Sequence, residues 1–417
     1  MSRDSSDIPW AVADKLKRVG TLQHHLAHPS ISLVAYSLMR RFEVADRALS
    51  RYRIYLDTKY MGISNPTTLS ASFSAAFENP ELWNPAGFRS ISVVGLRDAS
   101  RGRPAAPHHS EILSVLTELV KAGKVWCPLS YDTFAEWQKQ EADSRMVTAR
   151  IMDLLCGGIM VQMESARVMA EISHFVWTHL LSEKHLIPVA RYMWLPVGFP
   201  TGEVFPTFTE LSSEVQLAIQ KSLFDVIQSV GMSEIALMLQ DESPLRESDE
   251  HLQRRQNIGA ALHRFNCRSF DHVFQMEVDG TSDLWVEKIE PFAADLLAKG
   301  HCLNIDRQPQ TGRENAINII SILTAGLKLK RISTALPCMH IHSSIHAAIR
   351  WSRQRYRKGD LHDHHHAIAA LPYFDAFLTD RKLAAILRNP LIDLSRKYNC
   401  QVFSDDAAIV RHLKSLF

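Results

Sequence analysis

Four short apolar runs of this chain end in a residue that carries a side-chain oxygen. The runs close in YLD at Asp57, PLS at Ser130, LTD at Asp380 and FSD at Asp405, and a segment with helical spacing follows each. Short runs of β-formers that alternate with helices are typical of a parallel sheet covered by helices. Ligands of such sheets bind beyond the carboxyl ends of the strands. We therefore expect an α/β fold in which these oxygens meet at one edge.

Two predicted helices add carboxylates to that edge. Asp363 shares a helix face with the small residues Ala367 and Ala370, which would let its helix lie close to the sheet. Glu136 lies in the first turns of the helix after the second strand. Converging carboxylates cannot all stay ionised without a cation, and Mg²⁺ and Mn²⁺ prefer oxygen ligands. The pattern predicts a carboxylate-bound Mg²⁺ or Mn²⁺ site that hydrolyses phosphodiester bonds.

Each acid also has a purely structural interpretation. An aspartate after a strand is a common helix N-cap or turn residue. Glu136 together with Thr133 matches a capping box. The coincidence of several acids at one sheet edge favours the functional interpretation, and both stay open.

Further oxygen-bearing residues are candidates for the same site. They are Asp360, Asp375, Thr379 and Ser130. Asp360 stands three positions before Asp363 and could share its helix face. The run His364, His365 and His366 crowds the same segment, and we expect these histidines to be bystanders.

Three stretches resemble the PIN and PIN-like nuclease family. They are IYLDTKYM, KVWCPLSYDTFAEW and DLHDHHHAIAALPYFDAFLTDRKL. Members of this family have a strand ending in Asp, an acid on a following helix, a D-x-x-H-x-A type helix and a strand ending in Thr-Asp. The resemblance implies that Asp57, Glu136, Asp363 and Asp380 are the catalytic, metal-binding acids. It also implies a three-layer α/β/α domain with a central parallel sheet, and metal-dependent cleavage of RNA by an endonuclease.

The expected domain is split in two along the chain. We expect a helical N-terminal segment (1–50), a first PIN-like part (51–156), a mainly helical insertion (157–332) and a second PIN-like part (333–417). A small strand pair is expected around 270–291 within the insertion. A compact family member has no such helical block. The elaboration suggests a regulated enzyme, such as a toxin or defence effector, whose insertion binds a regulatory protein or a second copy of the chain.

A basic segment lies just before the third predicted acid. It contains Arg350, Arg353, Arg355, Arg357 and Lys358, with Trp351 and Tyr356 among them. We expect a basic helix over 342–357 that attracts the phosphate backbone of single-stranded or structured RNA and offers rings for stacking. The alternative is a solvated helix face without a ligand.

Three other interpretations remain. His342 and His346 are spaced to share a helix face and could bind zinc. Glu171 and His174 form an ExxH pair of the kind found in di-iron helical bundles. The chain could also be a catalytically inactive PIN-like scaffold that binds RNA or protein. The absence of GxGxxG, GxxxxGK[ST] and GxSxG disfavours dinucleotide-binding, P-loop and α/β-hydrolase enzymes.

Composition limits the remaining classes. The formal net charge is only +2, so any nucleic-acid surface must be a local patch. The six cysteines are scattered and form no CxxC pair, which favours a reducing compartment. The N-terminus has no apolar leader and no long apolar run occurs, so we expect a cytoplasmic protein with no membrane partner.

Overall fold

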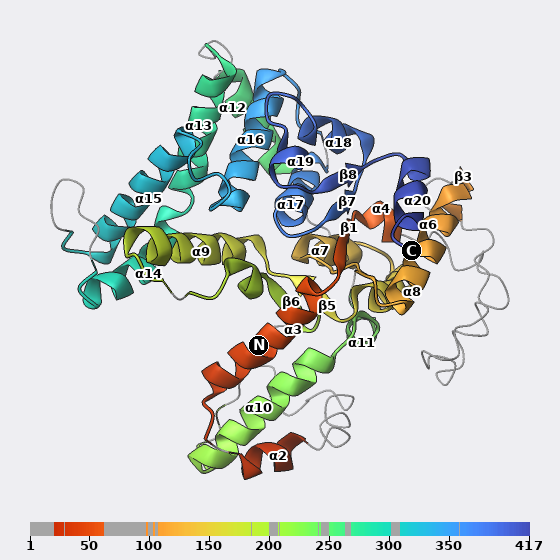
Figure 1. The fold of residues 1–417 in the computed structure, drawn as a ribbon, viewed down its shortest axis with the longest axis vertical. Helices are drawn as coiled ribbons and strands as arrows, with labels where there is room; N and C mark the ends of the chain where they lie inside the picture. The colour runs from red at the N-terminus through yellow and green to blue at the C-terminus, as the bar shows by residue number, and fades with distance from the viewer. Residues whose placement is uncertain are drawn as a thin grey trace.

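The computed structural model describes most of the 417 residues. The described residues are 21–28, 30–61, 97–98, 103–104, 107–184, 186–199, 207, 209–240, 242, 250–262, 268–301, 309–357 and 359–417. They form a mostly helical α/β fold with a small parallel sheet (Figure 1). The candidate Lys358 lies outside the described residues. So do two segments whose sequence patterns predict a helix after residue 65 and a strand at 88–96.

The sheet joins strands that lie far apart in the sequence. Its order is β4-β1-β7-β8 and every pair is parallel, as expected. The strands are β1 (Tyr52–Leu56), β4 (Val125–Trp126), β7 (Ala376–Leu378) and β8 (Gln401–Phe403). Tyr55 stands opposite Phe377, and the Asp57 N–H donates to the Leu378 carbonyl at 3.0 Å. This register brings the ends of β1 and β7 together.

The chain after β4 also pairs with the start of the predicted insertion. Leu129 forms a parallel bridge with Met160, which belongs to β5 (Ile159–Val161). β5 in turn pairs antiparallel with β6 (Trp194–Pro196). A separate antiparallel pair joins β2 (Arg97–Asp98) and β3 (Arg103–Pro104). Residues just after position 156 are therefore attached to the sheet.

Both faces of the sheet are buried by helices. Alternation along β1 sends Ile54 and Leu56 to one core and Tyr55 to another. The first core is completed by α6 (Pro107–Lys121), α8 (Ala142–Cys156), α11 (Met232–Met238) and α20 (Asp406–Lys414). The second is completed mainly by α9 (Glu164–Phe175), α16 (Pro337–Trp351), α17 (Asp360–Ala370) and α18 (Arg381–Leu387).

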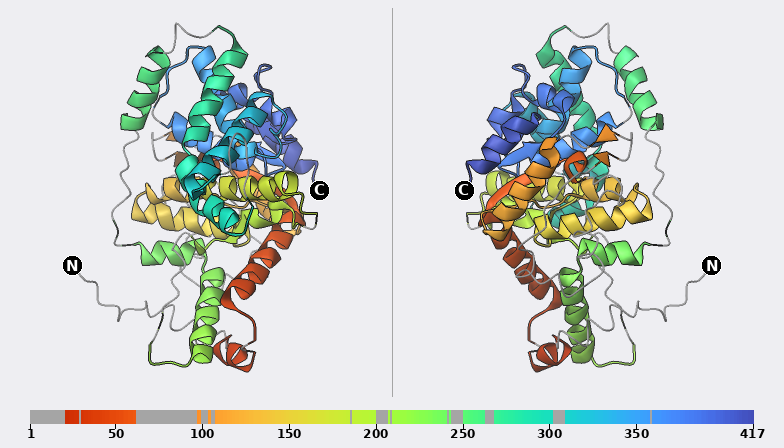
Figure 2. Two further views of the ribbon diagram at one scale, coloured as in Figure 1. Left: turned by 90° about the vertical axis from the view of Figure 1, so that its left-hand side faces the viewer. Right: turned by 90° about the vertical axis from the view of Figure 1, so that its right-hand side faces the viewer.

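An arm of helices projects from the body of the molecule. It consists of α2 (Thr21–Ala27), α3 (Leu33–Leu49) and α10 (Ser213–Ser229), and the side views show how far it extends (Figure 2). Asp225 of α10 holds the arm together. It accepts hydrogen bonds from His25 Nε2 at 2.9 Å and from the Tyr36 hydroxyl at 2.6 Å.

The rest of the predicted insertion is helical, and the strand pair expected around 270–291 is wrong. The helices are α12 (Glu250–Leu262), α13 (Phe270–Asp283), α14 (Val286–Ala298) and α15 (Gly312–Lys328), after the short π-helix η3 (Val176–Leu180) and the 3-10 helix η4 (Val189–Met193). The β-formers Val273, Phe274 and Val278 recur at helical spacing and are buried, so tertiary packing overrides their β-propensity.

The expected basic helix over 342–357 is correct only in its first part. Helix α16 ends at Trp351, and Arg353 has a left-handed backbone with φ 56°. Tyr356 is buried, and its carbonyl accepts hydrogen bonds from Gln253 and Asn257 of α12 at 2.7 and 3.1 Å. These contacts turn the chain away from the helix axis.

Three short helices complete the described fold. They are α4 (Thr58–Met61), α7 (Tyr131–Gln138) and α19 (Leu394–Lys397). Among the described helices, none combines the length and the apolar character that spanning a bilayer requires.

A glycine pair at the end of α8 offers a matched test of the packing beneath β4. Gly157 has φ +59°, and a Cβ there would lie 2.4 Å from the Trp126 ring. Gly158 has φ +71°, but a Cβ there would meet nothing within 4 Å. We expect Gly157→Ala to lower the free energy of unfolding by about 3 kcal/mol or more, from backbone strain plus overpacking, and Gly158→Ala by about 1–2 kcal/mol from strain alone. Urea unfolding followed by circular dichroism measures both, and equal costs would contradict this packing.

Candidate functional site

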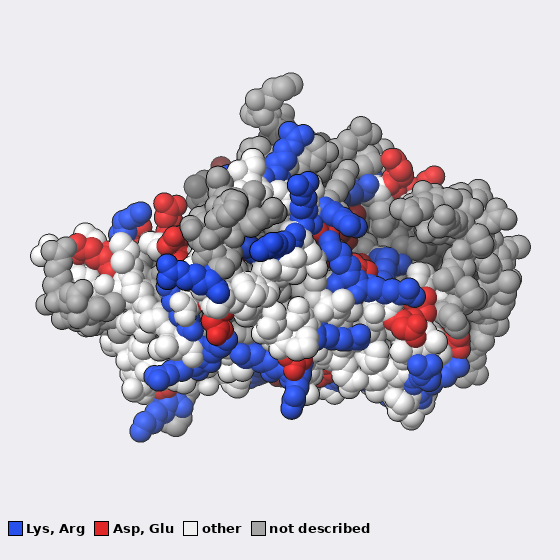
Figure 3. All heavy atoms as spheres, turned by 90° about the horizontal axis from the view of Figure 1, so that it is seen from above, with Lys and Arg blue, Asp and Glu red and all other residues white. Residues whose placement is uncertain are grey.

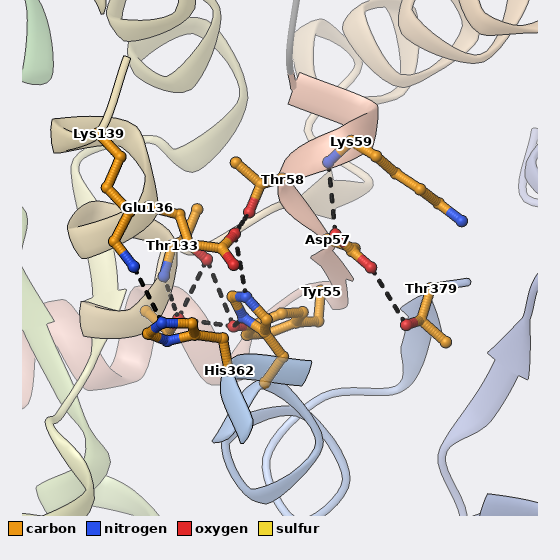
Figure 4. Close-up of polar contacts among 11 residues, drawn as sticks. Tyr55, Asp57, Thr58, Lys59, Thr133, Glu136, Lys139, His362 and Thr379 are labelled. Atoms are coloured by element: carbon orange, nitrogen blue, oxygen red, sulfur yellow. Dashed lines mark hydrogen bonds and ion pairs between the residues drawn. The ribbon is translucent and has the colours of Figure 1, made fainter. Parts of the chain in front are cut away.

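Two of the predicted acids meet at the carboxyl edge of the sheet. Asp57 follows β1, and Asp380 follows the neighbouring strand β7. The Thr379 hydroxyl donates to Asp57 Oδ2 at 3.2 Å, and the Lys59 backbone N–H donates to Oδ1 at 3.3 Å (Figure 4). Asp380 also caps α18, because its Oδ1 accepts from the Leu383 N–H at 2.8 Å. The N-cap interpretation therefore holds for one oxygen of Asp380.

Asp363 joins these two acids from helix α17. Burial and the negative charges of Asp57 and Asp380 raise the pKa of Asp363 to about 7. Burial also raises the pKa of Asp57. Within the described part of the chain, the Asp363 carboxyl makes no hydrogen bond or ion pair that would offset its charge. The three aspartates thus share one crowded, partly desolvated region.

Glu136 reaches the same region from α7. Its Oε2 accepts a hydrogen bond from the Thr58 hydroxyl and lies 3.2 Å from Nε2 of His366. Although burial opposes the change, the contact with His366 lowers the pKa of Glu136 overall. The capping-box alternative is wrong, because α7 begins after Ser130, whose Oγ accepts from the Thr133 N–H at 3.0 Å.

His366, which we expected to be a bystander, is a buried residue of the site. Its Nδ1 lies 2.5 Å from the Tyr55 hydroxyl, which lies 2.6 Å from the Ser130 hydroxyl. Burial alone would lower the pKa of His366, but Tyr55 and Glu136 hold that pKa well above its usual value. This shift in pKa favours the protonated, positively charged imidazole beside the acids. Only its position three residues after Asp363, on the same helix face, could have indicated this.

Two of the further candidate acids are engaged elsewhere. Asp375 precedes β7 at the opposite edge of the sheet, where Arg53 donates to it from its backbone N–H at 2.7 Å and from its guanidinium at 2.9 Å. Asp360 accepts from the Arg357 N–H at 2.8 Å and pairs with Lys382. We therefore leave both out of the candidate site. Ser130 belongs to it only through Tyr55.

The basic segment divides into paired and exposed residues. Arg350 forms a largely buried ion pair with Glu277 at 2.8 Å, so its charge is already used inside the protein. Arg353, Arg355 and Arg357 are exposed. Tyr356 is buried and donates to or accepts from His346 Nδ1 at 2.6 Å, so it offers no ring for stacking.

The zinc and di-iron alternatives receive no support from the geometry. The rings of His342 and His346 stack with centroids 4.5 Å apart instead of converging on one point. Glu171 is buried and accepts from the Cys338 N–H at 3.1 Å and from the Tyr373 hydroxyl, and burial raises its pKa to about 7.

The acidic site fits a hard divalent cation in the kind of ligand it offers. Carboxylate oxygens are the ligands that Mg²⁺ and Mn²⁺ prefer. Burial and the neighbouring carboxylates raise the pKa of Asp363, and a cation would offset both effects. In their present arrangement, no three His, Cys, Asp or Glu side chains of the described residues could hold a metal ion. Binding would therefore require the carboxylates to move closer together.

Comparisons with known proteins do not assign a family. The chain matches no protein-family model, and no curated protein or solved structure is significantly similar to it.

The charge on Asp363 has a consequence for stability. Because the pKa of Asp363 is raised in the folded state, folding takes up a proton between about pH 4 and pH 7. Above pH 7 Asp363 is ionised in both states, and its buried charge lowers the free energy of unfolding by the full amount. We expect Asp363→Asn to raise the free energy of unfolding at pH 8 by about 1–3 kcal/mol, allowing for partial exposure. This gain should fade toward pH 4, where wild-type Asp363 is protonated in the folded state.

Urea unfolding at pH 4.5 and pH 8 checks this expectation. Asp375→Asn is the matched control, because it removes a carboxylate that Arg53 pairs and should destabilise the protein at pH 8. A destabilised Asp363→Asn variant at pH 8 would contradict the crowding of the three aspartates.

Proposed function

We propose that this chain is a PIN-like, Mg²⁺- or Mn²⁺-dependent endoribonuclease. One observation carries the proposal: Asp363 is close enough to Asp57 and Asp380 for their charges, together with burial, to raise its pKa to about 7. These carboxylates come from three separate segments of the chain and gather at the carboxyl edge of a parallel sheet, where such folds bind ligands.

The proposal includes a three-layer α/β/α domain interrupted by the helical insertion. The strand order β4-β1-β7-β8 and the helical cores on both faces of the sheet support it. So does the order of the acids along the chain, with the insertion between the second and third. We further propose that the insertion regulates the enzyme through a protein partner or a second copy. A groove of about 810 Å³ between α13, α14 and α15 is the feature that supports this role.

Three aspartates would hold the metal ion. In this proposal Asp57, Asp363 and Asp380 would be its ligands, and a bound ion would supply Lewis acidity for the phosphodiester and its leaving oxygen. The Thr379 hydroxyl fixes the orientation of the Asp57 carboxylate through its 3.2 Å hydrogen bond. Asp380 keeps Oδ2 for the site because its helix cap uses Oδ1.

Glu136 would orient the attacking water. Its Oε2 is held by Thr58 and His366, which leaves Oε1 to accept a hydrogen bond from water. His366 keeps this carboxylate ionised and in place. It acts through Glu136, as a positioning residue.

The substrate class is inferred from charge. Arg353, Arg355 and Arg357 are exposed on the segment that leads into α17, the helix of Asp363. Lys and Arg side chains also gather on the face seen from above in Figure 3, although the whole chain carries only +2. Exposed arginines on the segment that leads to Asp363 suit a polyanion whose backbone is cut at the acids.

A second candidate is the catalytically inactive scaffold. Two observations favour it: His366 already pairs with Glu136, and no described group of three such side chains is arranged to hold a metal. A scaffold would bind RNA through the same basic face but would not cleave it.

Cleavage of labelled single-stranded RNA with Mn²⁺ tests the nuclease. We expect wild-type protein to cut internal bonds and to stop when EDTA is added. Asp57→Asn should lose about a thousandfold in kcat/KM, because it removes one proposed ligand of the ion. Asp375→Asn, a change of the same kind at the other edge of the sheet, should retain activity. Folded wild-type protein without activity, or equal activity in Asp57→Asn, would favour the scaffold.

Variants of two arginines distinguish a role in RNA binding from a role in stabilising the fold. Arg355→Ala should weaken RNA binding and lower the slope of log K against log salt by about 0.7, with unchanged stability. Arg350→Ala should instead destabilise the protein by about 2–4 kcal/mol, because it leaves Glu277 buried without its partner. Fluorescence anisotropy at several salt concentrations and urea unfolding measure the two effects. A stable Arg350→Ala variant with the larger binding defect would reverse the assignment.

A further inference from the structure

A lysine and a histidine meet beside the acidic site. Lys139 follows the last turn of α7, and its Nζ lies 2.9 Å from Nε2 of His362, in the first turn of α17. Within the described residues, no carboxylate forms an ion pair with Lys139. The Lys139 ammonium is therefore held in place by its contact with His362.

Lys59 stands on the other side of the site. Its ammonium lies 4.7 Å from the centroid of the Tyr60 ring, and the charges of Asp57, Asp380 and Asp363 act on it. Figure 4 shows Lys59 on the Asp57 side of the site, and Lys139 with His362 on the side of Glu136. The charge of Lys139 also acts on Glu136 and helps to lower its pKa, after the larger effects of burial, which opposes the change, and of His366. The Lys139 ammonium, which His362 contacts, thus stands on the Glu136 flank of the acids.

A nucleic-acid strand presents a phosphate on each side of the one that is cleaved. If the scissile phosphodiester lies at the acids, the next phosphate along the strand must pass over one flank. An ammonium fixed by a neighbouring side chain suits such a phosphate, because little rotational freedom is lost when the charge-assisted hydrogen bond forms.

We propose that Lys139 binds the phosphate next to the scissile bond, and that His362 positions its ammonium. This subsite rests on the proposed nuclease function and deepens it. It makes the enzyme select a strand that continues past the cleaved bond, in preference to a single phosphodiester.

Two substrates test the subsite. Single-stranded RNA has the neighbouring phosphate, whereas bis(p-nitrophenyl) phosphate has only the phosphodiester that is cleaved. We expect Lys139→Ala to raise KM for RNA about tenfold and to reduce its salt slope by about 0.7. Hydrolysis of bis(p-nitrophenyl) phosphate with Mn²⁺ should stay unchanged. Lys139→Arg should restore much of the RNA activity, and His362→Ala should show a smaller defect confined to RNA.

Matched controls distinguish this subsite from a general loss of charge. Lys299→Ala removes a lysine on α14 that pairs with Asp295 at 2.7 Å, and should leave both substrates unaffected. An unchanged KM for RNA in Lys139→Ala, or an equal loss on both substrates, would overturn the subsite. Circular dichroism verifies that each variant is folded.

The binding of RNA separates failure of the subsite from failure of the nuclease. If wild-type protein cleaves neither substrate, the proposed function fails. Anisotropy with labelled RNA in the Asp57→Asn background still decides the subsite, because Lys139→Ala should weaken binding about tenfold there. Equal affinity with and without Lys139 in that background would overturn it.

Discussion

The parallel pairing of β1 with β7 is the constraint on which the candidate site depends. Asp57 and Thr379 are 322 positions apart, yet the register of these strands places their side chains 3.2 Å from each other. A slip of one residue would turn every side chain of a strand to the other face. The register is fixed because Ile54 and Leu56 fill one core while Tyr55 fills the other. Core packing therefore determines where the acids lie.

Positive charge is distributed unevenly around these acids. His366 lies inside the protein, fixed by the Tyr55 hydroxyl, and it stabilises Glu136 as a carboxylate. Lys59 stands on the other side of the site, and the charges of the aspartates act on it. The charge of His366 lowers the pKa of Asp363, but burial and the charges of Asp57 and Asp380 outweigh it and keep that pKa raised to about 7. Asp363 therefore gives the strongest argument for a cation.

Local sequence patterns predicted the elements of the sheet, and they predicted which residues would stand at its carboxyl edge. Strand ends and helix spacing are encoded within a few residues. The positions of Asp57 and Asp380 after strands, and of Asp363 on a helix, could therefore be predicted without the fold. The contacts of His366 with Tyr55 and Glu136 join segments of the chain far apart in sequence, and no local pattern encodes them. Local propensity also failed around 270–291, where burial of a helix face outweighed β-forming residues.

The residues that end the strands show how capping and function can coexist. Ser130 and Asp380 both cap helices, as the structural interpretation required. Ser130 has a single side-chain oxygen, already bonded to the Thr133 N–H and the Tyr55 hydroxyl, so it can reach the acids only through Tyr55. A carboxylate has two oxygens, and the cap of α18 uses only one of those of Asp380. Ser130 can therefore serve only as a helix cap, whereas Asp380 can cap α18 and still offer an oxygen to a ligand.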